Sequence, residues 1–144
     1  MTLIRPTFRN PEHLQVLPER EWLRQQLPSG REGFIAEDLD LVVRAYGPRY
    51  GLDALGRFRL IELKRGNASL GTSKRMTFGL IDQGLRTGAT AERYDGYYVV
   101  RTSEAWDEAQ VFNVNGIDLA HGQFRRWLQK ADTEAIKPIH LDLR

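Results

Sequence analysis

The sequence predicts an α/β protein with a central mixed β-sheet that is flanked by helices. Two short runs rich in Leu, Ile and Val, residues 38–44 and 59–64, have the length and composition of strands. A third such run, residues 97–101, follows an amphipathic segment that we expect to be a helix ending at Gly88. This order of strand, strand, helix and strand is typical of α/β chains, in which the third strand can run parallel to an earlier one.

The length and composition fit one soluble domain. At 144 residues the chain can bury a core without covalent cross-links. We therefore expect a single domain over residues 1–144, with an arm at residues 1–10 and a tail at residues 132–144. The start of the chain does not resemble a signal peptide and no apolar run approaches 18 residues, so we expect a cytoplasmic protein that does not bind membranes.

Several chemistries are excluded by composition. The chain has no cysteine, which rules out thiolate catalysis and cysteine-ligated zinc. Its three histidines, His13, His121 and His140, lack the spacing of a zinc site, and no Gly-x-Ser-x-Gly turn is present. The net charge of only +2 argues against a general polyanion binder.

The first helix is expected over residues 18–27. Pro18 suits the first helical position, and the Pro28-Ser29-Gly30 run should stop the helix.

The two apolar runs are expected to form one antiparallel hairpin. Between them, residues 47–56 carry three glycines and a proline, which favour turns. If the loop is centred on Gly51, residues whose numbers sum to about 102 lie opposite one another. Asp40 then faces Glu62, and Val42 faces Leu60.

The pair formed by Asp40 and Glu62 suggests a metal site. Side chains alternate along a strand, so Glu62 and Lys64 point the same way, roughly 6.6–6.8 Å apart. The neighbouring Leu60, Ile61 and Leu63 indicate a strand covered on both faces. Two buried carboxylates repel unless a proton or cation lies between them, and a divalent ion meets that need. Two simpler readings stay open: a structural ion pair, or a half-exposed strand with solvated charges.

Asp40, then Glu62-Leu63-Lys64, then a helix that carries Gln83 resemble the PD-(D/E)XK nuclease superfamily. The resemblance covers about residues 32–101 and is greatest to the compact virus-type replication-repair nuclease branch. Two features depart from the pattern: Leu39 stands where many members have proline, and the loop at residues 65–73 is long. The resemblance implies a restriction-endonuclease-like core with the order α-β-β-β-α-β.

The resemblance also implies an activity and a set of roles. Asp40, Glu62 and the carbonyl of Leu63 would hold Mg²⁺, with Mn²⁺ as a substitute. Lys64 would act on the attacking water, and Gln83 would position water or phosphate. Glu19 is the candidate for a supporting acid on the first helix, with Glu21 and Glu12 as rivals. The implied protein is an Mg²⁺-dependent endodeoxyribonuclease of bacterial or phage type; RNA as a substrate and a homodimer both stay open.

The helix after the hairpin decides how Gln83 is placed. Thr72 or Ser73 can cap this helix. Helical spacing places Met76, Leu80, Ile81 and Leu85 on one apolar face, with Arg75, Asp82 and Arg86 toward water. Gln83 then falls at the border of that face, where it can reach the edge of the sheet.

The rest of the chain supplies further expected strands and candidate nucleic-acid contacts. Residues 109–114 are expected to form a strand that ends in the turn Asn115-Gly116, and residues 139–143 an edge strand. A last helix is expected to bury Ala120, Phe124, Trp127, Leu128 and Ala131. The basic residues expected to contact nucleic acid are Arg65, Lys74, Arg75, Arg125 and Arg126.

Overall fold

A computed structural model describes residues 18–26, 37–129 and 136–139. The chain divides into two compact units, Met1–Ala36 and Glu37–Arg144, and each is described by itself. In the first unit, α1 spans Pro18–Gln26, which confirms the expected first helix. The expected arm at residues 1–10 lies outside the described residues, as do residues 33–36 and most of the tail.

The second unit begins with the predicted hairpin. Strand β1 (Leu41–Ala45) pairs antiparallel with β2 (Arg57–Arg65), and a short 3-10 helix, η3 (Pro48–Tyr50), lies in the loop between them. Leu41 lies opposite Ile61 and Val42 opposite Leu60, so the predicted register is confirmed. The loop depends on Gly56, which has a φ of 74° and on which a Cβ atom would lie 1.8 Å from a backbone oxygen of β1.

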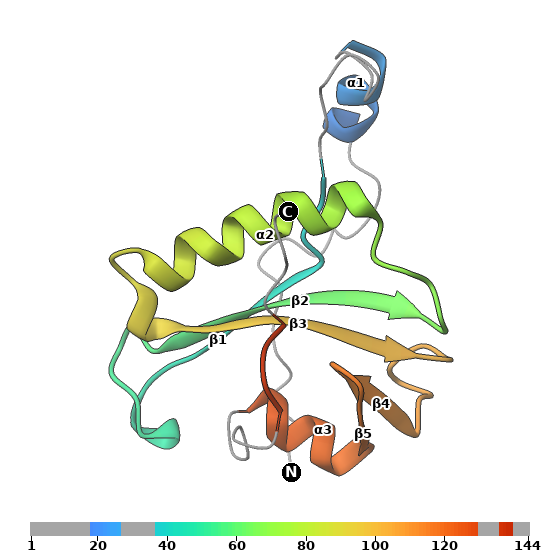
Figure 1. The fold of residues 1–144 in the computed structure, drawn as a ribbon. Helices are drawn as coiled ribbons and strands as arrows, with labels where there is room; N and C mark the ends of the chain where they lie inside the picture. The colour runs from blue at the N-terminus through green and yellow to red at the C-terminus, as the bar shows by residue number, and fades with distance from the viewer. Residues whose placement is uncertain (1–17, 27–36, 130–135, 140–144) are drawn as a thin grey trace. The chain divides into compact units, whose positions relative to one another are not determined.

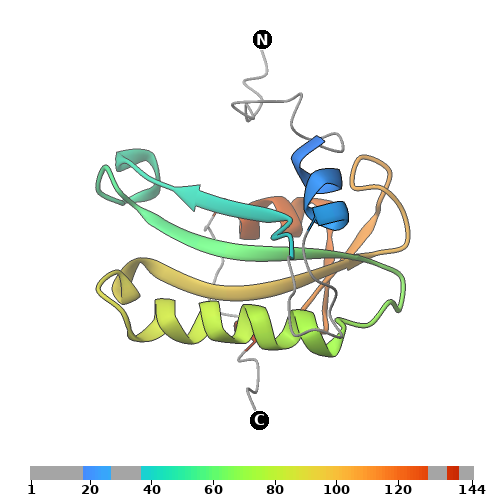
Figure 2. The same cartoon turned by 90° about the horizontal axis from the view of Figure 1, so that it is seen from above.

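A helical crossover follows and returns the chain parallel to β2. Helix α2 (Thr72–Thr87) and the short η4 (Ala91–Arg93) lead into β3 (Tyr94–Thr102). Strands β4 (Val111–Val114) and β5 (Ile117–Ala120) then add antiparallel pairs. The sheet order is β1-β2-β3-β4-β5, and Figure 2 shows the first three strands side by side.

These elements confirm an α/β class with a five-stranded mixed sheet. In the described part of the chain two strands, rather than the expected three, precede α2, and β5 was not expected. The predicted Asn115-Gly116 turn is confirmed, with positive φ at both residues (50° and 89°). The last helix, α3, spans His121–Leu128, so Ala120 ends β5 rather than lying inside the helix.

Helices lie on both faces of the sheet: α2 over one and α3 over the other (Figure 1). On the α2 side, Leu60, Tyr97 and Val99 pack with Phe78. On the α3 side, Ile61 and Tyr98 pack with Trp127 and the residues around it. Successive residues of β2 and β3 therefore face opposite layers, which explains why both strands consist of nearly continuous apolar runs. No helix in the described ranges is long and apolar enough to cross a membrane.

Helix α2 buries a different face from the one expected. The prediction of an apolar face through Met76, Leu80, Ile81 and Leu85 was wrong for three of the four: Leu80 is 65% exposed, Met76 and Ile81 are exposed as well, and Leu85 packs, partly buried, against the core. The buried residues of α2 are Phe78, Gly79 and Asp82. Asp82 is fully buried because it accepts hydrogen bonds from the Tyr94 hydroxyl (2.6 Å) and from Nε of Arg86 (2.9 Å).

The strands also differ from the expectation in how deeply they are buried. The apolar composition of the first run indicated a buried strand, but β1 is the edge strand of the sheet and Val42 is 59% exposed. In β2, Leu60, Ile61 and Glu62 are buried, whereas Leu63 is exposed. The expected strand at residues 139–143 is described only at Ile139, which forms an isolated bridge with Tyr97.

Arg59 is a buried cation in the layer between the sheet and α3. Its Nη1 donates to the carbonyl of Trp127 (3.1 Å), and its guanidinium lies 4.3 Å from the centre of the Trp127 ring system. Burial lowers the pKa of Arg59 to about 10. The charge of Arg59 is therefore not solvated, contrary to the reading of β2 as a half-exposed strand.

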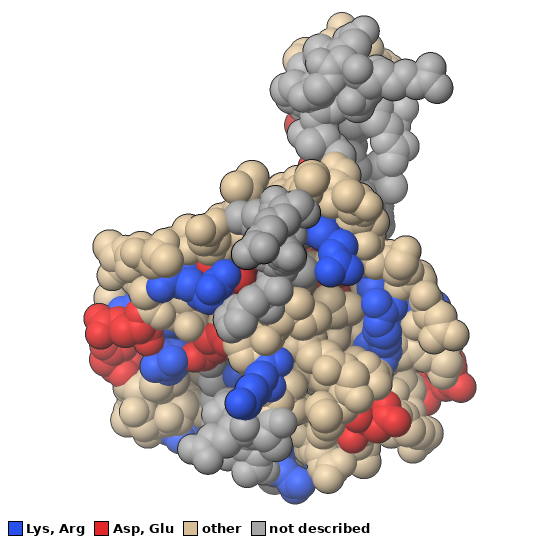
Figure 3. Space-filling model, viewed as in Figure 1, with Lys and Arg blue, Asp and Glu red and all other residues tan. Residues whose placement is uncertain are grey.

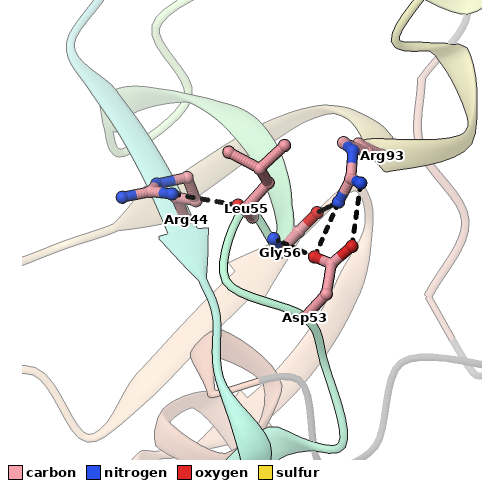
Figure 4. A network of polar contacts seen from close by, with 5 residues as sticks. All are labelled: Arg44, Asp53, Leu55, Gly56 and Arg93. Atoms are coloured by element: carbon pink, nitrogen blue, oxygen red, sulfur yellow. Dashed lines mark hydrogen bonds and ion pairs between the residues drawn. The ribbon is translucent and has the colours of Figure 1, made fainter.

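A network of polar contacts fastens the tip of the hairpin to η4 (Figure 4). Asp53 and Arg93 form a bidentate ion pair with two contacts of 2.8 Å, and Asp53 Oδ1 also accepts a hydrogen bond from the Gly56 amide (2.7 Å). Arg93 further donates to the carbonyl of Gly56, and Arg44 donates to that of Leu55. The Arg93 hydrogen bonds, followed by the Gly56 amide, hold the pKa of Asp53 well below its ordinary value of 3.8.

Candidate active site

The hairpin brings the two predicted carboxylates, Asp40 and Glu62, together. Asp40 directly precedes β1, and its Oδ2 accepts a hydrogen bond from the amide of Leu63 (2.8 Å). Glu62 lies next to Leu63 in β2 and is only 1% exposed. Asp40 itself is exposed, so the pair joins one solvated and one buried carboxylate.

Glu62 has an ion partner that the sequence analysis did not anticipate. Its Oε1 accepts a hydrogen bond from Nζ of Lys74, on the first turns of α2. Its Oε2 is buried and has no hydrogen-bond partner among the residues that the structure describes. One oxygen of this carboxylate is therefore paired with a cation, and the other oxygen can still accept a hydrogen bond or bind an ion.

The electrostatics of Glu62 reflect this incomplete pairing. Burial raises the pKa of Glu62, the hydrogen bond from Lys74 lowers it by less, and the charge of Asp40 raises it again. For Lys74, burial works against the charged form, but the hydrogen bond and charge of Glu62, with help from Asp40 and Glu37, raise its pKa. Lys74 therefore stays protonated while Glu62 holds its proton more tightly than an ordinary glutamate does.

Two further groups belong to this cluster. The hydroxyl of Tyr97 is buried without a hydrogen-bond partner in the described ranges, and burial, together with the charges of Glu62, Asp40 and Glu37, raises its pKa. Glu37 is the second of these groups. Residues 37–40 are not part of a strand, so the alternation does not apply to them, and the charge of Glu37 acts on both Lys74 and Tyr97.

Lys64 lies on the same face of β2 as Glu62. Alternation directs both side chains to the α2 side of the sheet, and Lys64 is paired in register with Arg101 of β3. Lys64 is partly exposed and makes no hydrogen bond or ion pair with any other residue in the described part of the chain. A free ammonium group two residues from a buried carboxylate is available to a ligand.

The other predicted site residues are more dispersed. Gln83 is exposed and lies on the side of α2 away from the buried Phe78 and Asp82. Arg65 is directed to the opposite face from Lys64 and approaches Thr102 (3.5 Å). Arg75 is exposed near the start of α2.

The remaining basic candidates lie over the other face of the sheet, and the remaining acidic candidates belong to the first unit. Arg125 and Arg126 are exposed on α3, which covers the face of the sheet opposite to α2. Glu19 is exposed on α1, in the first unit. Glu12 and the side chain of Glu21 lie outside the described residues.

The cluster suits one divalent cation that keeps several water ligands, rather than an ion held by protein groups alone. No group of three or more His, Cys, Asp or Glu side chains in the described ranges is arranged to hold a metal. Asp40 and Glu62 supply two carboxylates, and Glu62 Oε2 is an orphaned acceptor. The N–H and C=O of a strand residue point to the same side, so the Leu63 carbonyl is directed toward the edge where Leu63 binds Asp40. Such oxygen donors fit Mg²⁺, which keeps several waters.

The sequence contained a signal for Lys74 that the hydrophobic pattern concealed. Lys74, Phe78 and Asp82 are spaced four residues apart and share one helical face. That face carries two charged residues, so a search for apolar periodicity passes over it. Comparisons with protein-family models, with curated proteins and with solved structures found no match.

Proposed function

We propose that this protein is a metal-dependent nuclease that hydrolyses DNA phosphodiester bonds, with endonucleolytic cleavage. The observation that carries the proposal is the pairing of Asp40 with the buried, half-neutralised Glu62, beside the free ammonium group of Lys64. A buried carboxylate with an unused oxygen is expensive to maintain for stability alone, and groups of this kind concentrate at functional sites.

Asp40, Glu62 and the carbonyl of Leu63 would hold Mg²⁺, for which Mn²⁺ can substitute. When bound, the ion lowers the pKa of a water molecule and polarises the phosphate. Lys64 orients the attacking water and stabilises the negative charge that develops on the phosphate oxygens. Gln83, exposed on α2, would position water or the phosphate.

Lys74 acts as the counter-ion of Glu62 when no metal is bound. Its ammonium group lies on Glu62 Oε1, and a metal ion held by Oε2 would share the same carboxylate with it. Lys74 is 24% exposed and sits on the first turns of α2, from where a long flexible side chain can turn toward a phosphate group. A Lys74 side chain turned toward a phosphate would make the nucleic-acid contact that the sequence predicts for this residue.

The direct test is nicking of supercoiled plasmid with Mg²⁺ or Mn²⁺. We expect the wild-type protein to nick DNA with either ion, and a chelator to abolish the activity. Asp40→Asn should remove both the nicking and most of the increase in melting temperature that the ion produces by binding the folded state. An identical metal response in wild type and Asp40→Asn would contradict the proposal.

A second candidate is a nucleic-acid-binding or assembly module with the same site but no catalysis. The ion pair between Glu62 and Lys74 favours it, because a protein-made counter-ion already occupies one of the carboxylate oxygens. In that case DNA binding would persist in chelator, and neither ion would produce nicking at any concentration that saturates binding.

A further inference from the structure

A pocket of about 280 Å³ lies beside the candidate active site and carries positive charge. We propose that this pocket, which we call the arginine pocket, binds a phosphate group of a nucleic-acid strand. The choice of ligand rests on the proposed function, but the pocket itself does not. Its polar wall includes Ser69, Arg75 and Arg101, and its apolar wall includes Leu70, Val99 and Ile139.

The charged residues that line the arginine pocket are all positive. Arg75 and Arg101 both line it, and none of the lining residues is Asp or Glu. Nη1 of Arg101 donates to the carbonyl of Ala68, which holds the guanidinium in place and leaves its other N–H groups for a ligand. Guanidinium groups match the geometry of phosphate oxygens and bind them in a bidentate manner. Two arginines and the Ser69 hydroxyl are therefore suited to one phosphate.

The walls of the arginine pocket are formed before any ligand binds. Asn115 fastens two of them: its side-chain oxygen accepts from the Val99 amide, and its side-chain nitrogen donates to the Lys137 carbonyl, both at 2.8 Å. The bridge between Ile139 and Tyr97 holds the same segment against β3. The apolar residues of the lining can contact a sugar ring while the arginines hold its phosphate, as in ligand pockets that combine apolar walls with a few placed polar groups.

The register of the sheet places this pocket next to the candidate catalytic residues. Arg101 is paired with Lys64 on one side and with Asn113 on the other, and Val99 is paired with Glu62. Paired residues on neighbouring strands are about 4.7–4.9 Å apart, so the arginine pocket begins one strand away from Glu62 and Lys64. A strand whose scissile phosphate lies at Lys64 can therefore place a neighbouring phosphate in the pocket.

A localised contact of this kind is consistent with the modest charge of the chain. On the face drawn in Figure 3, Lys and Arg side chains surface at separate places among acidic and uncharged residues. The net charge of +2 provides little general attraction for nucleic acid. Affinity should then depend on a few placed contacts, and removal of one should be measurable.

The test uses the full chain in chelator, so that binding is measured without hydrolysis. Fluorescent single-stranded oligonucleotides with a 5′-phosphate or a 5′-hydroxyl are titrated with wild type, Arg75→Gln and Arg101→Gln. Arg49→Gln is the matched control, because it also removes one exposed arginine charge but lies at the other end of the hairpin. Arg101→Lys keeps the charge but removes the planar guanidinium group that can bind a phosphate in a bidentate manner. Melting temperatures verify that each variant is folded.

We expect Arg75→Gln and Arg101→Gln each to weaken binding about fivefold or more and to reduce the salt slope by about 0.7, with Arg49→Gln close to wild type. Loss of a preference for the 5′-phosphate strand would identify a terminal phosphate; equal weakening for both strands would identify a backbone phosphate. If both pocket variants behave like Arg49→Gln, the pocket proposal is wrong even if the protein nicks DNA. If the variants weaken binding but the wild type never nicks, the proposed nuclease activity fails and the pocket stands.

Discussion

The protein contains two carboxylate clusters on the same hairpin, and they differ in how completely they are satisfied. At the tip, Asp53 has both oxygens paired with Arg93 and a further hydrogen bond from Gly56, and its pKa is lowered. At the other end, Glu62 is buried with one oxygen bound to Lys74 and one unpartnered in the described residues, and its pKa is raised. The first arrangement stabilises a loop. The second leaves one carboxylate oxygen of Glu62 available to a ligand.

The contrast shows why ion pairs alone do not identify a functional site. Both clusters join an acid to a base across distant parts of the chain, and the tip has the better geometry. The Asp53–Arg93 ion pair is exposed to solvent, and exposed ion pairs contribute little to the free energy of unfolding. Glu62 is removed from water without full compensation, which is costly unless a ligand completes its coordination. The incomplete site is therefore the one to test for chemistry.

The largest expected effect follows from changing Lys64. Lys64→Ala should lower the nicking rate a hundred- to a thousandfold, because positioned charge at a developing oxyanion is worth on the order of 3–4 kcal/mol. Metal binding and DNA affinity should remain close to wild type, since the residue has no partner in the described structure to lose. Paired measurements of nicking rate and melting temperature decide the matter, and a stable variant that cuts at the wild-type rate would refute the role of Lys64.

Changing Lys74 should convert the buried carboxylate into a fully unpaired one. Lys74→Met leaves Glu62 without a counter-ion, which should cost on the order of 1–3 kcal/mol of unfolding free energy in metal-free buffer. Because the positive charge of Lys74 no longer lies beside the site, Mg²⁺ should bind more tightly and restore most of that loss. Chemical denaturation with and without Mg²⁺ measures both effects.

Arg93→Met is the matched control for Lys74→Met, since it breaks the ion pair at the hairpin tip. Its Glu62 site is intact, so Mg²⁺ should stabilise this variant by the same amount as it stabilises the wild type. Equal responses of the two variants to the ion would mean that Lys74 does not oppose metal binding at Glu62.

The smallest effect is a difference in pH dependence between the two clusters. A raised pKa in the folded state means that the stability contributed by Glu62 is lost as pH rises from its ordinary value of 4.5 through the folded value. The lowered pKa of Asp53 has the opposite sign: its contribution is present above 3.8 and is lost as pH falls below that value.

Unfolding free energies of wild type, Glu62→Gln and Asp53→Asn between pH 2 and pH 8 separate these signs. The advantage of wild type over Glu62→Gln should shrink as pH rises from 4, whereas its advantage over Asp53→Asn should grow as pH rises from 2. Parallel profiles would show that the environments of the two carboxylates are alike.

Local patterns in the sequence determined the hairpin, its register and several element boundaries. The glycines and proline of residues 47–56 set the turn, and the period of two along each strand then leaves one register, which places Asp40 beside Glu62. The Asn115-Gly116 turn and the start of α1 at Pro18 follow from similarly local preferences for backbone angles.

Only the tertiary structure decided which face of α2 is buried and what Glu62 binds. Apolar periodicity favoured Met76, Leu80 and Ile81, but the sheet presents Glu62 and Tyr94 to this helix. Burying those polar groups requires partners, and the helix supplies Lys74 and Asp82 by turning its other side inward. Apolar periodicity does not reveal a polar partner twelve residues away on another element, because the need for that partner arises only when the two elements pack.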